Sequence, residues 1–187
     1  RAFVKAPGIE DGRIKALASA HDQVARTDGG GLLRTLLEAE LEPYRHQPTA
    51  VILAGPNLWL SGPALSVAAL TLHELATNAA KYGALSVPSG NLHIRWFIDE
   101  AEGCWVLEWT ETGGPHVNPP KGNGFGSILL ERAIPHELGG TAKREFRPEG
   151  LFIRLTFPAR HTVLVAETAT VPETEGPIVA DTAQTER

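Results

Sequence analysis

The chain has 187 residues, of which 42% are hydrophobic and 21% charged, so it can build one domain with a real core. Its formal net charge of −5 argues against nucleic acid as the main partner, because phosphate binding requires a basic face. No apolar run approaches the roughly 18 residues that a membrane span needs, and no charged-then-apolar leader opens the chain. The single cysteine, Cys104, cannot form an internal disulfide, and we expect a reducing, cytoplasmic setting.

The first third of the chain alternates helical and strand patterns. Apolar residues at helical spacing predict a helix over 9–26, which ends at a run of Thr, Asp and Gly. A second helix is predicted over 32–41 from its row of leucines. Two short strands, 49–53 and 58–60, are expected to be joined by the turn at 54–57.

The longest predicted helix covers residues 63–82. Ser61 can cap its start, Pro63 suits its first turn and Gly83 suits its C-terminal end. One stripe of this helix is apolar, and we expect it to pack on a sheet. The stripe consists of Leu65, Ala68, Ala69, Leu72, Ala76 and Ala79.

The remaining regular elements are two hairpins with a helix between them. The first hairpin is expected to pair 92–98 with 105–109, and a glycine- and proline-rich loop follows at 113–124. The helix is expected at 125–138. The second hairpin is expected to pair 141–146 with 151–157. Because helices are spaced among hairpins, the order predicts an α/β (α+β) two-layer sandwich, with helices packed on one face of a mixed sheet.

Residues 161–187 differ from the rest of the chain. They contain five acidic residues and one basic residue, and they are rich in Thr, Ala, Glu and Pro without the periodicity of a helix or strand. We expect an acidic tail or linker that is mostly disordered, although 161–165 could add a strand. The chain has no Met and begins with Arg1, so we expect a fragment of a longer protein.

Three polar residues share one face of the longest helix. Glu74, Asn78 and Lys81 follow each other at i, i+4 and i+7. Around a magnesium-triphosphate, the amide oxygen can join the metal and the lysine can meet phosphate charge. The carboxylate can orient a water or accept a proton. The alternative is an ordinary solvated helix face.

Two further segments point to a nucleotide. Glu111 ends a strand and precedes Gly113, so its carboxylate is placed to accept a hydrogen bond from a ligand amine, such as that of adenine. The glycine-rich run 122–127 leads into a helix, whose N-terminus favours phosphate. The alternatives are an exposed carboxylate at a turn and a glycine-rich turn without a ligand. The run is neither a dinucleotide fingerprint nor a P-loop.

In this fixed order, the segments resemble the GHKL ATPase superfamily with its Bergerat-type ATP-binding fold: an N-box helix, an acidic G1 turn, a lid and a glycine-rich G2 turn. Within that group the chain is most similar to the HWE family of sensor histidine kinases. That family is named for an N-box histidine, here His73, and for a Trp-x-Glu motif, here Trp109, Thr110 and Glu111. The resemblance covers roughly residues 16–158.

The resemblance implies roles for individual residues. Glu74 assists phosphoryl transfer, Asn78 binds Mg²⁺, Lys81 contacts phosphate and Glu111 reads adenine. His73 marks the family and is placed with the catalytic residues, but its chemical role does not follow from its position; a structural histidine is the alternative. Trp109 is expected in the core. The remaining positions expected to bind ATP are Gly113, Gly124, Phe125, Gly126 and Ser127.

The implied function is the catalytic, ATP-binding domain of a two-component histidine kinase, which passes the γ-phosphoryl group of ATP to a histidine and onward to a response-regulator aspartate. We expect residues 1–26 to end a dimerisation region and residues 27–160 to form the catalytic domain. The sequence around His21 does not match the family's acceptor motif, so we expect the acceptor upstream, with a sensor module, in a homodimer. The alternatives are a GHKL module that holds nucleotide without transferring phosphate, and a GHKL ATPase.

Overall fold

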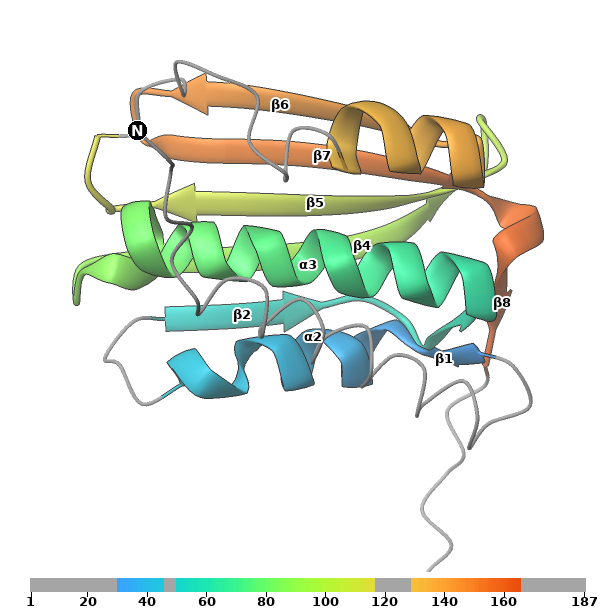
Figure 1. The fold of residues 1–187 in the computed structure, drawn as a ribbon, viewed down its shortest axis with the longest axis horizontal. Coiled ribbons are helices and arrows are strands. Elements are labelled where there is room, and N and C mark those ends of the chain that lie inside the picture. The colour runs from blue at the N-terminus through green and yellow to red at the C-terminus, as the bar shows by residue number, and fades with distance from the viewer. Residues whose placement is uncertain (1–29, 46–49, 117–128, 166–187) are drawn as a thin grey trace, which may run out of the picture.

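The computed structural model describes residues 30–45, 50–116 and 129–165. Figure 1 shows a twisted sheet with helices packed on one of its faces. The helix predicted over 9–26 and the G2 turn lie outside the described residues. Within them, the predicted two-layer arrangement of a mixed sheet and helices on one face is confirmed.

The main sheet has five strands in the order β2-β4-β5-β7-β6. Strand β2 runs parallel to β4, and the other neighbours are antiparallel. Both predicted hairpins, β4 with β5 and β6 with β7, are confirmed. The strands are β2 (Ala50–Ala54), β4 (Asn91–Asp99), β5 (Cys104–Thr112), β6 (Thr141–Arg147) and β7 (Gly150–Pro158).

Strand β3 (Leu58–Ser61) follows β2 in the chain but does not pair with it. It lies between β1 (Gly30–Leu32) and β8 (Thr162–Leu164) in a second, three-stranded sheet. The turn between β2 and β3 is anchored to the core instead, because the Trp96 indole donates a hydrogen bond to the Pro56 carbonyl at 2.7 Å. Because β8 pairs with β3, the possible strand within 161–165 is confirmed, and β8 belongs to the folded unit.

Helix α3 (Gly62–Tyr82) is the longest element of the described residues, and it packs over the sheet roughly along the direction of the strands (Figure 1). Its predicted apolar stripe is confirmed, since each of the six residues is 5% exposed or less. Pro63 occupies the first turn as predicted, but the Ser61 side chain makes no capping hydrogen bond. The helix ends where the Gly83 N–H donates to the Ala79 carbonyl at 3.0 Å.

Two shorter helices flank α3 on the same face of the sheet (Figure 1). Helix α2 (Leu33–Leu41) buries its leucine row, as its periodicity predicts. The helical segment η3 (Leu129–Leu138) has π-type turns with Pro135 inside it, and it buries Ile134 and Leu138. The described residues also contain the short 3₁₀ turns η1 (Glu42–Tyr44), η2 (Ala84–Ser86) and η4 (Ala159–His161). No helix in the described ranges is long and apolar enough to cross a membrane.

The face of the sheet away from the helices carries a row of paired charges. Glu108 lies on the central strand β5, directly opposite Arg95 on β4 and Arg154 on β7. Both arginines bind its carboxylate, and the Arg154 contact is 2.7 Å long. Glu108 is only 5% exposed, so this pairing satisfies a charge that would otherwise be costly to bury.

We predict that Leu72→Ala lowers the free energy of unfolding by about 2–5 kcal/mol, because the side chain is 1% exposed and its removal leaves a cavity under α3. Leu164→Ala is the matched control. Leu164 is 56% exposed, so the same change should cost about 0.5 kcal/mol. Urea unfolding of both variants measures the difference. Equal losses would contradict this packing of α3.

Candidate functional site

The three polar residues predicted to share a face all lie on α3, in its C-terminal half. Glu74 is 8% exposed, whereas Asn78 and Lys81 are exposed. The row thus runs from a buried carboxylate to an open amide and ammonium near the helix end. Lys81 in the last turn also suits the negative end of the helix dipole.

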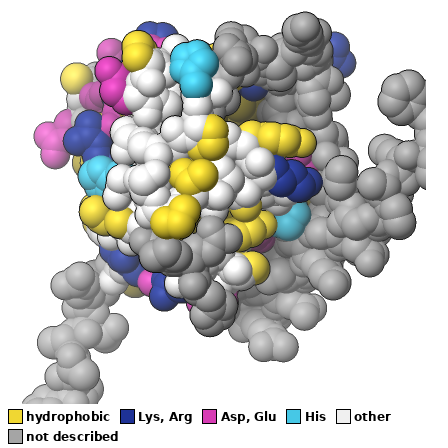
Figure 2. Space-filling view, turned by 90° about the vertical axis from the view of Figure 1, so that its left-hand side faces the viewer, with side chains coloured by type: hydrophobic (Ala, Val, Ile, Leu, Met, Phe, Trp, Pro, Cys, Tyr) yellow, Lys and Arg dark blue, Asp and Glu magenta, His cyan; other side chains and the backbone are white. Residues whose placement is uncertain are grey.

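At the end of α3 the chain turns back towards the sheet through residues 83–90. The Ser86 hydroxyl donates to the Gly83 carbonyl at 2.7 Å, and the Gly90 N–H donates to the Val87 carbonyl at 3.1 Å. Strand β4 begins directly afterwards, at Asn91. Figure 2 looks onto this end of the domain, where uncharged atoms and scattered hydrophobic side chains dominate the middle of the view and acidic side chains gather towards one side.

Glu111 connects the end of β5 with the end of α3. Its side chain is 3% exposed, on the helix-covered face of the sheet. One carboxylate oxygen accepts a hydrogen bond from the Trp109 indole N–H at 2.9 Å. The other accepts one from the backbone N–H of Ala84, also at 2.9 Å. The carboxylate therefore holds the first residue after Gly83 against strand β5.

The electrostatics of Glu111 reflect this position. Burial raises the pKa of its carboxyl group above the ordinary value, and the hydrogen bonds from Ala84 and Trp109 offset part of that rise. Both donors are neutral N–H groups, so they orient the carboxylate without cancelling its charge. A buried, oriented carboxylate is a strong acceptor for a ligand amine.

The glycines around this carboxylate are required because a Cβ at each would overlap a neighbouring side chain or backbone carbonyl. A Cβ on Gly83 would overlap Oε2 of Glu111, and one on Gly90 would overlap the Ala84 carbonyl. Gly113 has φ of 69°, which favours glycine, and a Cβ there would overlap the Ser89 carbonyl. The protein itself thus explains these glycines, while approach of a nucleotide to Gly113 stays a prediction.

His73 lies beside α2 and forms a hydrogen bond with it. Its Nδ1 lies 2.9 Å from Oε2 of Glu40, and the two side chains are 22% and 9% exposed. The contact ties the N-box helix to its neighbour, one residue before Glu74. It supports the structural interpretation of His73, and a chemical role stays untested.

Trp109 lies in the core, as predicted, with 0% exposure. Gly124, Phe125, Gly126 and Ser127, the predicted phosphate-side residues, lie outside the described ranges. The hydrogen bonds from Trp109 and Ala84 to Glu111 were not predicted from the sequence. The Trp-x-Glu spacing was the available signal for the first of these, because residues i and i+2 of a strand project from the same face.

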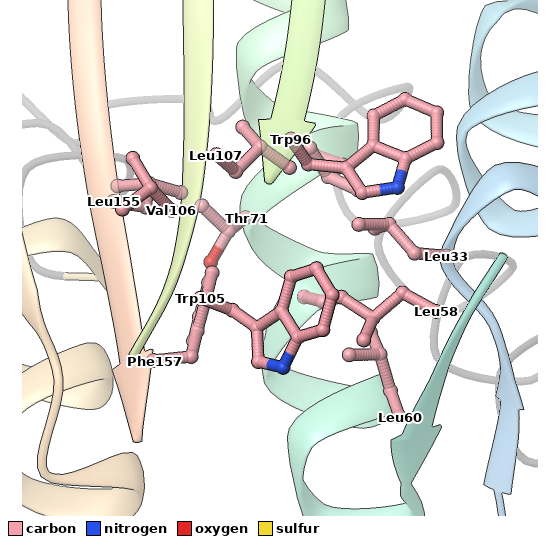
Figure 3. A pocket seen from close by; sticks show the side chains of 12 residues that line it. Leu33, Leu58, Leu60, Thr71, Trp96, Trp105, Val106, Leu107, Leu155 and Phe157 are labelled. Carbon is pink, nitrogen blue, oxygen red and sulfur yellow. The ribbon is translucent and has the colours of Figure 1, made fainter. Parts of the chain in front are cut away.

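The apolar pocket in Figure 3 is separate from this site. It lies between α3 and the sheet, among Trp96, Trp105 and Leu33, and its free volume is about 10 Å³. That volume is at the lower limit for one water molecule and far too small for an adenine ring. Its polar side chain, Thr71, already donates to the Val67 carbonyl at 2.8 Å. The pocket is a packing feature of the core.

The described residues fit an ATP-magnesium complex in their donor chemistry. An exposed amide at Asn78 and an exposed ammonium at Lys81 suit metal and phosphate, and the Glu111 carboxylate suits an amine. Among residues 30–45, 50–116 and 129–165, no three His, Cys, Asp or Glu side chains are grouped to hold a metal ion. These residues therefore suit a metal ion whose other ligands are the phosphates of ATP.

We predict that Gly83→Ala destabilises the fold by about 1–3 kcal/mol, because the new methyl group overlaps the Glu111 carboxylate. Gly83 has φ of −112°, so backbone strain does not contribute. In a Glu111→Ala background, the carboxylate is gone and most of this cost should disappear, which a double-mutant cycle of unfolding free energies measures. An equal cost in both backgrounds would contradict the predicted steric contact.

Comparison with known proteins finds histidine kinases. A family model described as HWE histidine kinase matches residues 9–57. The chain is 33% identical over 165 residues to a blue-light-activated histidine kinase of Brucella ovis, covering 86% of this chain and 34% of the relative. A homologue in Brucella anthropi is 36% identical over 150 residues, covering 78% and 30%. The chain thus spans about a third of the length of these relatives.

Solved structures show the same fold. The histidine kinase domain of the blue-light-activated kinase EL346 from Erythrobacter litoralis superposes with a TM-score of 0.65 at 15% identity, over 79% of this chain and 73% of that one. A mycobacterial sensor histidine kinase gives a TM-score of 0.54 at 19% identity, over 69% and 95%. Residues 9–57 of the chain thus match the HWE histidine kinase family, and its described part has the fold of histidine kinase catalytic domains.

Proposed function

We propose that this chain binds ATP with Mg²⁺ at the end of α3 and supplies the catalytic half of a histidine phosphorylation reaction. The observation that carries the proposal is the Glu111 carboxylate, which is buried, oriented by two N–H groups and joined to the end of the helix that carries Asn78 and Lys81. A purine amine at Glu111 would direct the triphosphate along the polar face of α3.

Glu74, Asn78 and Lys81 on α3 then have one task each. The Asn78 amide oxygen would be a ligand of the metal, and the Lys81 ammonium would contact phosphate oxygens. Bound Mg²⁺ would neutralise phosphate charge, as it does in phosphoryl transfer generally. Glu74 is 8% exposed, which suits a carboxylate that orients a water or accepts the proton of the attacking imidazole. Catalysis in this arrangement is positioning and charge neutralisation.

We also propose a place for the phosphoryl acceptor and the partners. We propose that residues 1–26 end a dimerisation region whose acceptor histidine lies upstream, and that residues 27–160 form the catalytic domain in a cytoplasmic homodimer. The phosphoryl group then passes to an aspartate of a response regulator. The relatives are named for activation by blue light, and the upstream sensor of this protein is where its own signal would act.

We predict that Asn78→Ala weakens magnesium-dependent ATP binding at least about tenfold, since it removes a metal ligand. Titration calorimetry with and without magnesium measures this. Asn57→Ala is the matched control, because Asn57 lies in the turn between β2 and β3, away from the C-terminal end of α3. Binding that does not need magnesium, or that falls equally in both variants, would contradict the assignment of Asn78.

We predict that Glu74→Gln in the full-length protein slows autophosphorylation by about 10²–10⁴-fold, the usual contribution of a positioned acid or base. ATP affinity should change little, because Glu74 acts on the attacking group and not on the nucleotide. Rapid-quench measurement of phosphohistidine at saturating ATP separates the two effects. An unchanged rate would leave Glu74 with a structural role only.

A further inference from the structure

Trp109 places a polar N–H group inside the core. The side chain is 0% exposed, and an indole N–H is a donor that needs an acceptor when it is buried. The acceptor is Oε1 of Glu111, at 2.9 Å. The two residues lie two positions apart on β5, so they project from the same face of the strand. Tryptophan and glutamate therefore form one hydrogen-bonded unit.

The second oxygen of Glu111 is held by the backbone of Ala84, at 2.9 Å. With one donor at each oxygen, the carboxylate plane is fixed between strand β5 and the end of α3. A carboxylate offers about four lone-pair positions. Among the described residues, Trp109 and Ala84 donate to two of these positions, so the carboxylate keeps acceptor capacity for a further donor.

Trp96 shows that a buried indole need not serve a site. It is 2% exposed, and its N–H donates to the backbone carbonyl of Pro56 at 2.7 Å, in the turn between β2 and β3. Its hydrogen bond therefore only satisfies a buried donor and anchors a turn. Trp109, in contrast, donates to an ionisable side chain that also contacts the N-box helix end.

We propose that Trp109 is a positioning residue for nucleotide selection: its indole N–H fixes the Glu111 carboxylate so that the open lone pairs face the exocyclic amine of adenine. The inference rests on the proposed ATP site and adds to it a residue that need not touch the nucleotide. Guanine carries a carbonyl oxygen where adenine carries the amine, so an oriented carboxylate attracts one base and repels the other. Without the indole donor, the carboxylate is free to turn and the preference falls.

The test is Trp109→Phe in this chain, with Trp96→Phe as the matched control. Both changes keep an aromatic ring and remove one buried indole hydrogen bond. Calorimetry with magnesium complexes of ATP, GTP and purine riboside triphosphate, which lacks the amine, gives the preference for the amine. We expect Trp109→Phe to weaken ATP binding about tenfold and GTP binding much less, and Trp96→Phe to keep the wild-type ratio.

Each result has a separate meaning. If the wild-type chain folds and binds no ATP, the proposed function fails, and the inference fails with it. If the wild type prefers ATP and Trp109→Phe keeps the same ratio, only the role of Trp109 is overturned. Should Trp109→Phe not fold, benzothienylalanine at position 109 replaces the N–H by sulfur at nearly constant shape. An unchanged ATP-to-GTP ratio in that variant overturns the proposal, and a reduced one supports it.

Discussion

The buried carboxylate of Glu111 is the contact on which this end of the molecule depends. It is held by the Trp109 indole from its own strand and by the Ala84 amide from the segment that follows α3. Burying a carboxylate is costly unless hydrogen bonds compensate, and the raised pKa of Glu111 shows that the compensation is partial. The result of this burial is a hydrogen-bond acceptor with a fixed orientation between the end of β5 and the end of α3.

The neighbouring backbone is shaped by that contact. A Cβ on Gly83 would occupy the space of the Glu111 carboxylate. Gly90 lets the segment 83–90 fold back on Ala84, and Gly113 lets Ser89 of that segment lie against the G1 turn. On the other side of α3, the contact between His73 and Glu40 ties the same helix to α2. The N-box helix is thus fixed at its end and along its side, so its polar face keeps one orientation relative to Glu111. Such preorganisation is what phosphoryl transfer by positioning requires.

Periodicity and turn residues predicted most of the fold. The stripe of α3 and the two antiparallel hairpins have strong local patterns, and the structure confirms them. The separation of β2 and β3 into two sheets was not predictable locally, because β3 pairs with β1 and with β8, which is distant in the chain. The ion pairs of Glu108 with Arg95 and Arg154 likewise join three strands, and they depend on the register in which those strands pair. At the site, the residues of α3 and Glu111 were named from the sequence, but the Ala84 contact spans 27 positions and has no local signal.

The most direct test of this account is a pH titration of the nitrogen-15-labelled chain by NMR, following the Trp109 indole and the Ala84 amide. If both donate to one buried carboxylate, both signals should move together with a single midpoint above the ordinary pKa of glutamate, since burial raises the pKa of Glu111. As pH falls through that midpoint, protonation should weaken both hydrogen bonds. Signals that titrate separately, or with the midpoint of an exposed carboxyl group, would contradict the two hydrogen bonds by which Glu111 connects Trp109 with Ala84.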